Sequence, residues 1–130
     1  MLERGRNTIP KKNLLRAFAP ALIVLFLCQP AAGHAVLVES APAANSKVRG
    51  PEVSIRLRFN SRIDAGRSRL TLLRPDGTSE SLKIPEQSSP DTLTSTANGL
   101  VPGDYKLRWQ VLATDGHITR GEIPFAVAGN

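Results

Sequence analysis

Apolar and polar residues alternate strictly in the segment 53–59, VSIRLRF, and this alternation restricts the fold more than any other feature. Side chains of a β-strand point to opposite faces with period two, so such a segment has one buried and one solvated face. The same period recurs in 105–111, YKLRWQV, and in 123–127, IPFAV. No segment carries a sustained helical period, so the sequence predicts an all-β domain.

Turn-forming residues separate these segments. RPDG at 74–77 has Pro and Asp at the central positions and Gly last, which predicts a type I turn between two hairpin strands. The remaining chain divides into shorter candidate strands at 35–39, 68–73, 79–84 and 92–96, and loops at 42–46, 85–91 and 101–104. Strands at intervals of about 8 to 12 residues with turns between them predict a β-sandwich of about seven strands.

The stretch GLVPGDY at 99–105 supports the sandwich. Pro102, Gly103 and Tyr105 stand in the order of a tyrosine corner, in which a Tyr near the start of a late strand sends its hydroxyl back to the backbone just upstream. The alternative is a simple turn followed by a strand tyrosine. We favour the corner because it agrees with the strand pattern.

The first 33 residues have the composition of a secretory signal peptide. Residues 2–16 carry five basic residues against one acid, and the apolar run 17–27 is shorter than the roughly 20 residues that a membrane-spanning helix needs. Ala31 and Gly33 suit the −3 and −1 positions of a cleavage site, so we expect cleavage after Gly33 and export to the periplasm. An uncleaved anchor and a lipoprotein through Cys28 are weaker alternatives, because prolines interrupt the run and the residue before the cysteine is not small.

Cleavage changes the charge and the chemistry of the chain. The leader 1–33 holds five of the 17 basic and one of the 11 acidic residues, which leaves 12 basic and 10 acidic residues in the domain 34–130, a net charge of +2. This nearly neutral domain, with few aromatic residues, is predicted neither to bind nucleic acid nor to be embedded in a membrane. The only Cys and Met are Cys28 and Met1, so the domain has no thiolate and no thioether. It also has no nucleophile elbow or glycine-rich phosphate loop, which argues against an enzyme.

The stretch TDGHITRG at 114–121 is the most informative for chemistry. Asp115 and His117 are two positions apart, so in extended backbone both side chains project to the same side. Gly116 between them permits an unusual backbone angle. A carboxylate and an imidazole on one side of a loop form half of a metal site. The alternative is a capped turn in which Asp115 binds backbone amides and His117 is merely exposed.

His34 changes the balance between these alternatives. Cleavage after Gly33 would give His34 a free α-amine, and the amine and imidazole Nδ1 of one residue can close a chelate ring on one metal ion. With a nitrogen from His117 and an oxygen from Asp115, the donor set is N₃O, which suits the tetragonal preference of Cu(II). Zn(II) prefers a tetrahedron, and Ni(II) is a competitor in vitro.

Two long motifs resemble the CopC-type periplasmic copper-resistance proteins, and the resemblance extends over essentially all of 34–130. The opening HAVLVESAPAANSKV is similar to that family's N-terminal histidine, short strand and Ser-x-Pro-Ala loop. The ending LVPGDYKLRWQVLATDGHITRGEIPFAV is similar to its Pro-Gly-x-Tyr, Trp-containing strand, Asp-x-His and final strand. The resemblance implies a Greek-key β-sandwich of the immunoglobulin-like or cupredoxin-like kind.

The resemblance also implies copper binding and delivery in the periplasm, with His34, Asp115 and His117 as ligands and a CopD-like inner-membrane copper transporter as a possible partner. The chain departs from family members with two sites, because the domain has no methionine for Cu(I). It therefore resembles the members that bind Cu(II) alone. Some relatives add a glutamate ligand; Glu39 and Glu52 are available, and the sequence assigns neither.

Two other functions remain open at this point. Copper polysaccharide monooxygenases also use a mature N-terminal His and a second His, but Asp115 would fill a position that oxygen needs, and the domain lacks a broad aromatic surface for polysaccharide. A metal-free immunoglobulin-like interaction module would have the same sandwich, since a fold does not specify a function. Only the two histidines and Asp115 argue against that module.

Overall fold

The computed structural model of the chain describes residue 5 and residues 34–129. The predicted leader, apart from Gly5, lies outside the described residues, and its cleavage after Gly33 stays a prediction. Within the described part, no helix is long and apolar enough to cross a membrane.

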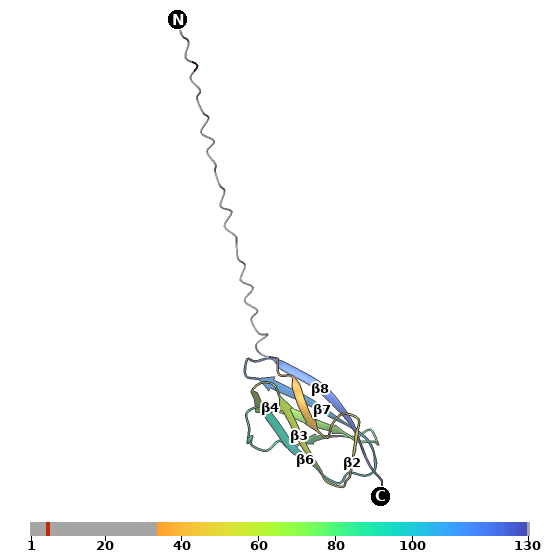
Figure 1. Ribbon diagram of the computed structural model, residues 1–130. Coiled ribbons are helices and arrows are strands. Elements are labelled where there is room, and N and C mark those ends of the chain that lie inside the picture. Colours follow the sequence, from red (N-terminus) through yellow and green to blue (C-terminus); the bar gives the residue numbers. More distant parts are fainter. Residues whose placement is uncertain (1–4, 6–33, 130) are drawn as a thin grey trace.

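The domain consists of two β-sheets packed face to face (Figure 1). All of their strand pairs are antiparallel except β2 with β8. One sheet has the strand order β1-β3-β6, and the other has the order β2-β8-β7-β4-β5. The strands are β1 (Leu37–Ala41), β2 (Ser46–Val48), β3 (Val53–Phe59), β4 (Ile63–Leu73), β5 (Ser79–Leu82), β6 (Thr92–Ala97), β7 (Gly103–Ala113) and β8 (Ile118–Val127). The all-β sandwich that the alternation predicts is confirmed.

Most strand boundaries differ from the sequence-based expectation by one or two residues, and three differences are larger or add a strand. β4 begins at Ile63 rather than at 68, because its pairing with β7 continues past a bulge between Asp64 and Arg69 where the apolar alternation breaks. β8 begins at Ile118 rather than at 123, because its polar first half pairs with β7 along the whole ladder. β2, inside an expected loop region, is an eighth strand that exists through its parallel pairing with the end of β8.

The core lies between the two inner faces. Phe59 of β3 meets Trp109 of β7 edge to face at 5.2 Å between ring centroids, and Tyr105 of β7 stacks on Phe125 of β8 at 5.5 Å. Every buried hydrophobic residue of the described part lies between Ala35 and Val127. The segment 34–129 therefore contains both sheets and the core between them.

Both predicted local motifs are confirmed. In the 74–78 hairpin, the Gly77 N–H donates to the Arg74 carbonyl at 3.0 Å, the Arg74 N–H donates to the Thr78 carbonyl at 2.8 Å, and Gly77 has a φ of +85°. This is a type I turn closed by a glycine in the left-handed region. The Tyr105 hydroxyl donates to the Val101 carbonyl at 2.7 Å, four residues upstream, which is the tyrosine corner.

We expect Tyr105→Phe to lower the free energy of unfolding by about 1 kcal/mol, because it deletes one buried hydroxyl hydrogen bond while keeping the stacked ring. Urea unfolding followed by the fluorescence of Trp109, the single tryptophan, measures this change.

Ser40→Ala is a matched control, because the Ser40 hydroxyl also donates to a carbonyl, at 2.8 Å, but only to Pro42, two residues away. If Tyr105→Phe lowers the free energy of unfolding no more than Ser40→Ala does, then the tyrosine corner does not stabilise the fold more than a local hydrogen bond.

Candidate metal centre

The Asp-Gly-His stretch is the loop of the β7–β8 hairpin. The Ala113 N–H donates to the His117 carbonyl at 2.8 Å, and the Gly116 N–H donates to the Ala113 carbonyl at 2.9 Å. Gly116 has a φ of +89°, which a residue with a side chain rarely adopts. The backbone here is therefore a turn and not extended, and Asp115 binds the backbone N–H of His117 as in the capped-turn alternative. The tight turn, rather than strand periodicity, brings the side chains of Asp115 and His117 together.

The Asp115 carboxylate contacts His117 twice. Its Oδ1 accepts the backbone N–H of His117 at 3.0 Å, and its Oδ2 lies 2.7 Å from the imidazole Nδ1. Both hydrogen bonds lower the pKa of the Asp115 carboxyl below its ordinary value, and the bond from the backbone N–H contributes most. The carboxylate is therefore ionised at neutral pH. A carboxylate at Nδ1 favours the tautomer with its proton there, which leaves the lone pair of His117 on Nε2.

Two anchors hold His34 at this end of the domain. Ala35 is fully buried in the core. Val36 is then fixed by a pair of hydrogen bonds with Asn60: the Val36 N–H donates to Asn60 Oδ1 at 2.8 Å, and the Asn60 N–H donates to the Val36 carbonyl at 2.9 Å. We call this pair the Asn60 clamp. The sequence analysis missed Asn60, because nothing local in a loop asparagine indicates a partner 24 positions away.

The anchored residue lies beside the hairpin loop. The ring centroids of His34 and His117 are 5.1 Å apart, and their planes are inclined by 46°. Figure 1 shows that the chain enters the domain at this end and leaves β8 at the opposite end. The His117 side chain is 61% exposed and that of Asp115 is 29% exposed, so the group is open to solvent.

The three residues predicted as ligands are thus neighbours, but their side chains alone do not complete a metal site. Among residues 34–129, no three His, Cys, Asp or Glu side chains are arranged to hold a metal ion. Asp115 is turned to His117, and the α-amine of His34 exists only after cleavage.

Neither glutamate left open by the sequence completes the group. Glu39 is engaged in ion pairs, at 3.1 Å with Arg58 and 3.7 Å with Arg56. Glu52 lies just before β3, and Asn60, which holds the segment next to His34, lies just after it. The seven residues of β3 span about 20 Å, so Glu52 is at the opposite end of this strand from the histidines.

Comparison with known proteins agrees with this architecture. The sequence model of the CopC domain family matches residues 37–128. Protein YobA of Escherichia coli K12 is 32% identical over 116 residues, which cover 85% of this chain and 92% of YobA. Copper transport protein CutJ of Bacillus subtilis is 23% identical over 109 residues, which cover 82% of this chain but 20% of CutJ.

Solved structures with the same fold include two from this family. CopC from Methylosinus trichosporium OB3b superimposes with a TM-score of 0.65 at 30% identity, over 72% of this chain and 93% of that one. PcoC, a methionine-rich copper resistance protein from Escherichia coli, gives a TM-score of 0.61 at 26% identity, over 73% of this chain and 99% of that one. Because the CopC domain model matches residues 37–128 and YobA is 32% identical over 92% of its own length, this chain belongs to the CopC family.

Proposed function

We propose that this protein binds Cu(II) in the periplasm, without catalysing a reaction, and buffers the ion or carries it to a partner such as a CopD-like inner-membrane transporter. The observation that carries the proposal is the contact between His34 and His117, whose rings are 5.1 Å apart although 83 positions (117 minus 34) separate them in the chain. A sandwich of this size needs no histidine pair for its core, and both rings are exposed.

The proposed donor set has four atoms from three residues. His34 supplies its α-amine and Nδ1 as one chelate, His117 supplies Nε2, and Asp115 supplies an oxygen. Asp115 Oδ2 lies at Nδ1 of His117, on the side of the ring away from Nε2, so the carboxylate must turn away from Nδ1 to place an oxygen on the same metal. Three nitrogens and one oxygen favour Cu(II) over Zn(II), and Cu(II) stands at the top of the divalent affinity series.

The relatives support copper as the metal, since PcoC and CutJ are named as copper resistance and copper transport proteins. PcoC is described as methionine-rich, whereas the only Met and the only Cys of this chain lie in the predicted leader. Soft sulfur ligands select Cu(I), so their absence from 34–130 favours a protein that handles Cu(II) alone.

The exposure of the site suits transfer rather than permanent storage. A partner can approach His117, which is more than half exposed, and exchange ligands one at a time. The ligands must also lose protons to bind the metal, so acid weakens the complex. The α-amine, with an ordinary pKa of about 7.7 to 8.0, is the hardest of them to deprotonate near neutral pH.

Loss of a carboxylate that supports a metal ligand weakens metal binding by roughly 10- to 100-fold. We expect His34→Ala and His117→Ala each to weaken Cu(II) binding by more than this. Asp115→Asn should weaken it by at least this amount. Competition titration against a Cu(II) chelator measures the affinity, and electron paramagnetic resonance of the complex counts the nitrogen donors. Glu52→Gln is the control and should bind as the parent does. Unchanged affinity in both histidine variants would leave a metal-free interaction module as the better explanation.

A second prediction concerns the N-terminus itself. Five Gly and Ser residues added before His34 convert its amine into an amide, remove the chelate and keep the new amine away from the site, so Cu(II) affinity should fall, while the fold stays intact because the core begins at Ala35. The same five residues added after Asn130 are the matched control. If both extended proteins bind Cu(II) as tightly as the protein that begins at His34, then the amine is not a ligand. Mass spectrometry of the exported protein identifies its first residue independently.

The Asn60 clamp gives a third prediction. Asn60→Ala removes the acceptor for the Val36 N–H, frees the segment before β1 and should weaken Cu(II) binding although it deletes no ligand. Amide hydrogen exchange at Val36 should become faster in the same variant. Asn98→Ala, in an exposed loop, is the control. Faster exchange at Val36 with unchanged Cu(II) affinity would mean that holding His34 in place contributes nothing to the affinity.

A further inference from the structure

Positive charge is concentrated on the outer face of the five-stranded sheet. The outward-pointing positions of β2, β4, β7 and β8 carry five cations and three carboxylates: Lys47, Arg69, Lys106, Arg108 and Arg120, with Asp64, Asp104 and Glu122. We call this set the basic face. Its net charge is +2 (five minus three), which equals the +2 of all of 34–130 (12 minus 10), so the rest of the domain is neutral overall.

Most of these cations lack a carboxylate partner within the sheet. Glu122 is shared by Arg108, at 2.8 Å, and Lys106, at 3.7 Å. Arg120 donates instead to the neutral Gln110 at 2.9 Å. Among residues 34–129, Lys47, Arg69 and Arg120 make no ion pair.

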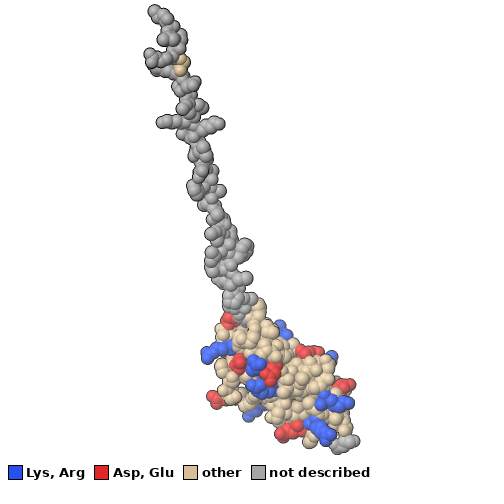
Figure 2. Space-filling model, in the orientation of Figure 1, with Lys and Arg blue, Asp and Glu red and all other residues tan. Residues whose placement is uncertain are grey.

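The opposite sheet differs in this respect. Its outward arginines, Arg56 and Arg58, both contact Glu39 and are partly neutralised by it. On the side of the domain seen in Figure 2, acidic and basic side chains are likewise interspersed. Three of the six cations that make no ion pair within 34–129 therefore lie on the basic face, and the other three, Arg49, Arg62 and Lys83, lie outside its strands.

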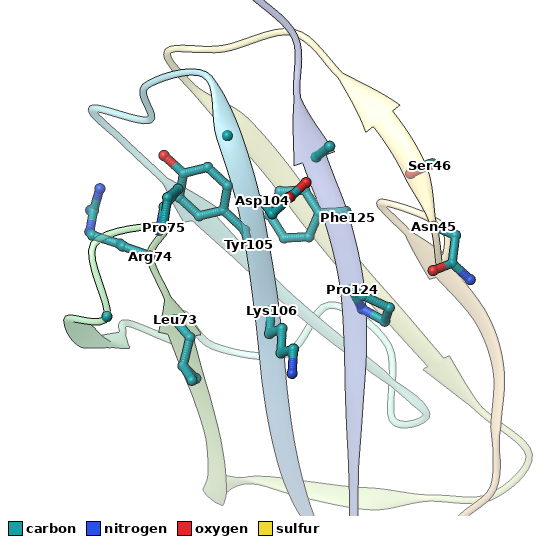
Figure 3. A pocket seen from close by; sticks show the side chains of 13 residues that line it. Asn45, Ser46, Leu73, Arg74, Pro75, Asp104, Tyr105, Lys106, Pro124 and Phe125 are labelled. Carbon is teal, nitrogen blue, oxygen red and sulfur yellow. The ribbon is translucent and has the colours of Figure 1, made fainter.

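The basic face is broad and shallow. It has two open hollows, one of about 530 Å³ around Arg69, Arg108 and Arg120, and one of about 710 Å³ whose floor includes Leu73 and Pro124. In Figure 3, Lys106 lies between Leu73 and Pro124 on three neighbouring strands, and their register places them in one row. At the end that bears the histidines, the next outward residue after Arg120 is Ile118, which is 51% exposed.

We propose that the basic face docks the domain on a bilayer surface that contains anionic phospholipid. Cations spread over four strands match a planar array of phosphates, and each Lys or Arg near such a surface adds to the attraction. The exposed Ile118, at the end of this face, is an apolar side chain that can enter the headgroup region. The hollow around Arg69, Arg108 and Arg120 is open to solvent, so it does not enclose a single small anion. The inference does not depend on metal binding.

The test uses metal-free protein that begins at His34, because this part contains the complete sandwich and lacks the apolar leader. Co-sedimentation with phosphatidylcholine vesicles, with and without phosphatidylglycerol, measures the partition coefficient. We expect binding only to the anionic vesicles, and much weaker binding at about 0.15 M than at about 0.01 M salt, since the Debye length falls from about 30 Å to about 8 Å.

Two double variants with the same change of net charge locate the surface. Arg69→Gln/Arg120→Gln should lower the partition coefficient by about 30-fold, which corresponds to about 1 kcal/mol for each arginine. Arg56→Gln/Arg58→Gln, on the other sheet, should bind nearly as the parent does. Equal loss in both variants, equal binding to zwitterionic vesicles, or binding of an oligoglutamate peptide without binding of anionic vesicles would each overturn the proposal.

Discussion

The antiparallel ladder between β7 and β8 is the interaction on which the rest of the structure depends. It runs without interruption from the pair Gly103–Val127 to the pair Leu112–Ile118. Its inner side supplies much of the core, including the Trp109 contact with the other sheet. Its open end carries the tyrosine corner, and its closed end is the loop that presents Asp115 and His117. A change of register by one residue would move all of these side chains to the wrong face.

The candidate metal centre joins the closed end of this ladder to the segment that precedes the first strand. His117 is fixed by a tight turn, whereas His34 precedes the first strand and is held through the burial of Ala35 and the Asn60 clamp. A metal ion between the two histidines would tie the beginning of the chain to the last hairpin. Because it would bind only the folded arrangement, the ion would also stabilise the fold by mass action.

The distribution of charge follows from the same two-layer architecture. Strand periodicity sends every second residue of β7 and β8 to the solvent, and those positions include the cations Lys106, Arg108 and Arg120. The opposite sheet pairs its outward arginines with Glu39, so the two faces differ although the domain is close to neutral. The basic face borders the end that holds the histidines, so docking through this face would bring the proposed metal site close to the surface on which the protein rests.

The sequence by itself determined the sandwich, the 74–78 turn and the tyrosine corner, because strand alternation and turn chemistry are local properties of the chain. It also singled out His34, Asp115 and His117, through a predicted cleavage site and a short motif. Only the tertiary structure decided that His34 meets His117, that Asp115 faces the imidazole Nδ1 within a hairpin, that Asn60 holds the segment after His34, and that a three-residue β2 forms at all. Each of these depends on hydrogen bonds or packing between residues far apart in the chain, and no local pattern of side chains records such contacts.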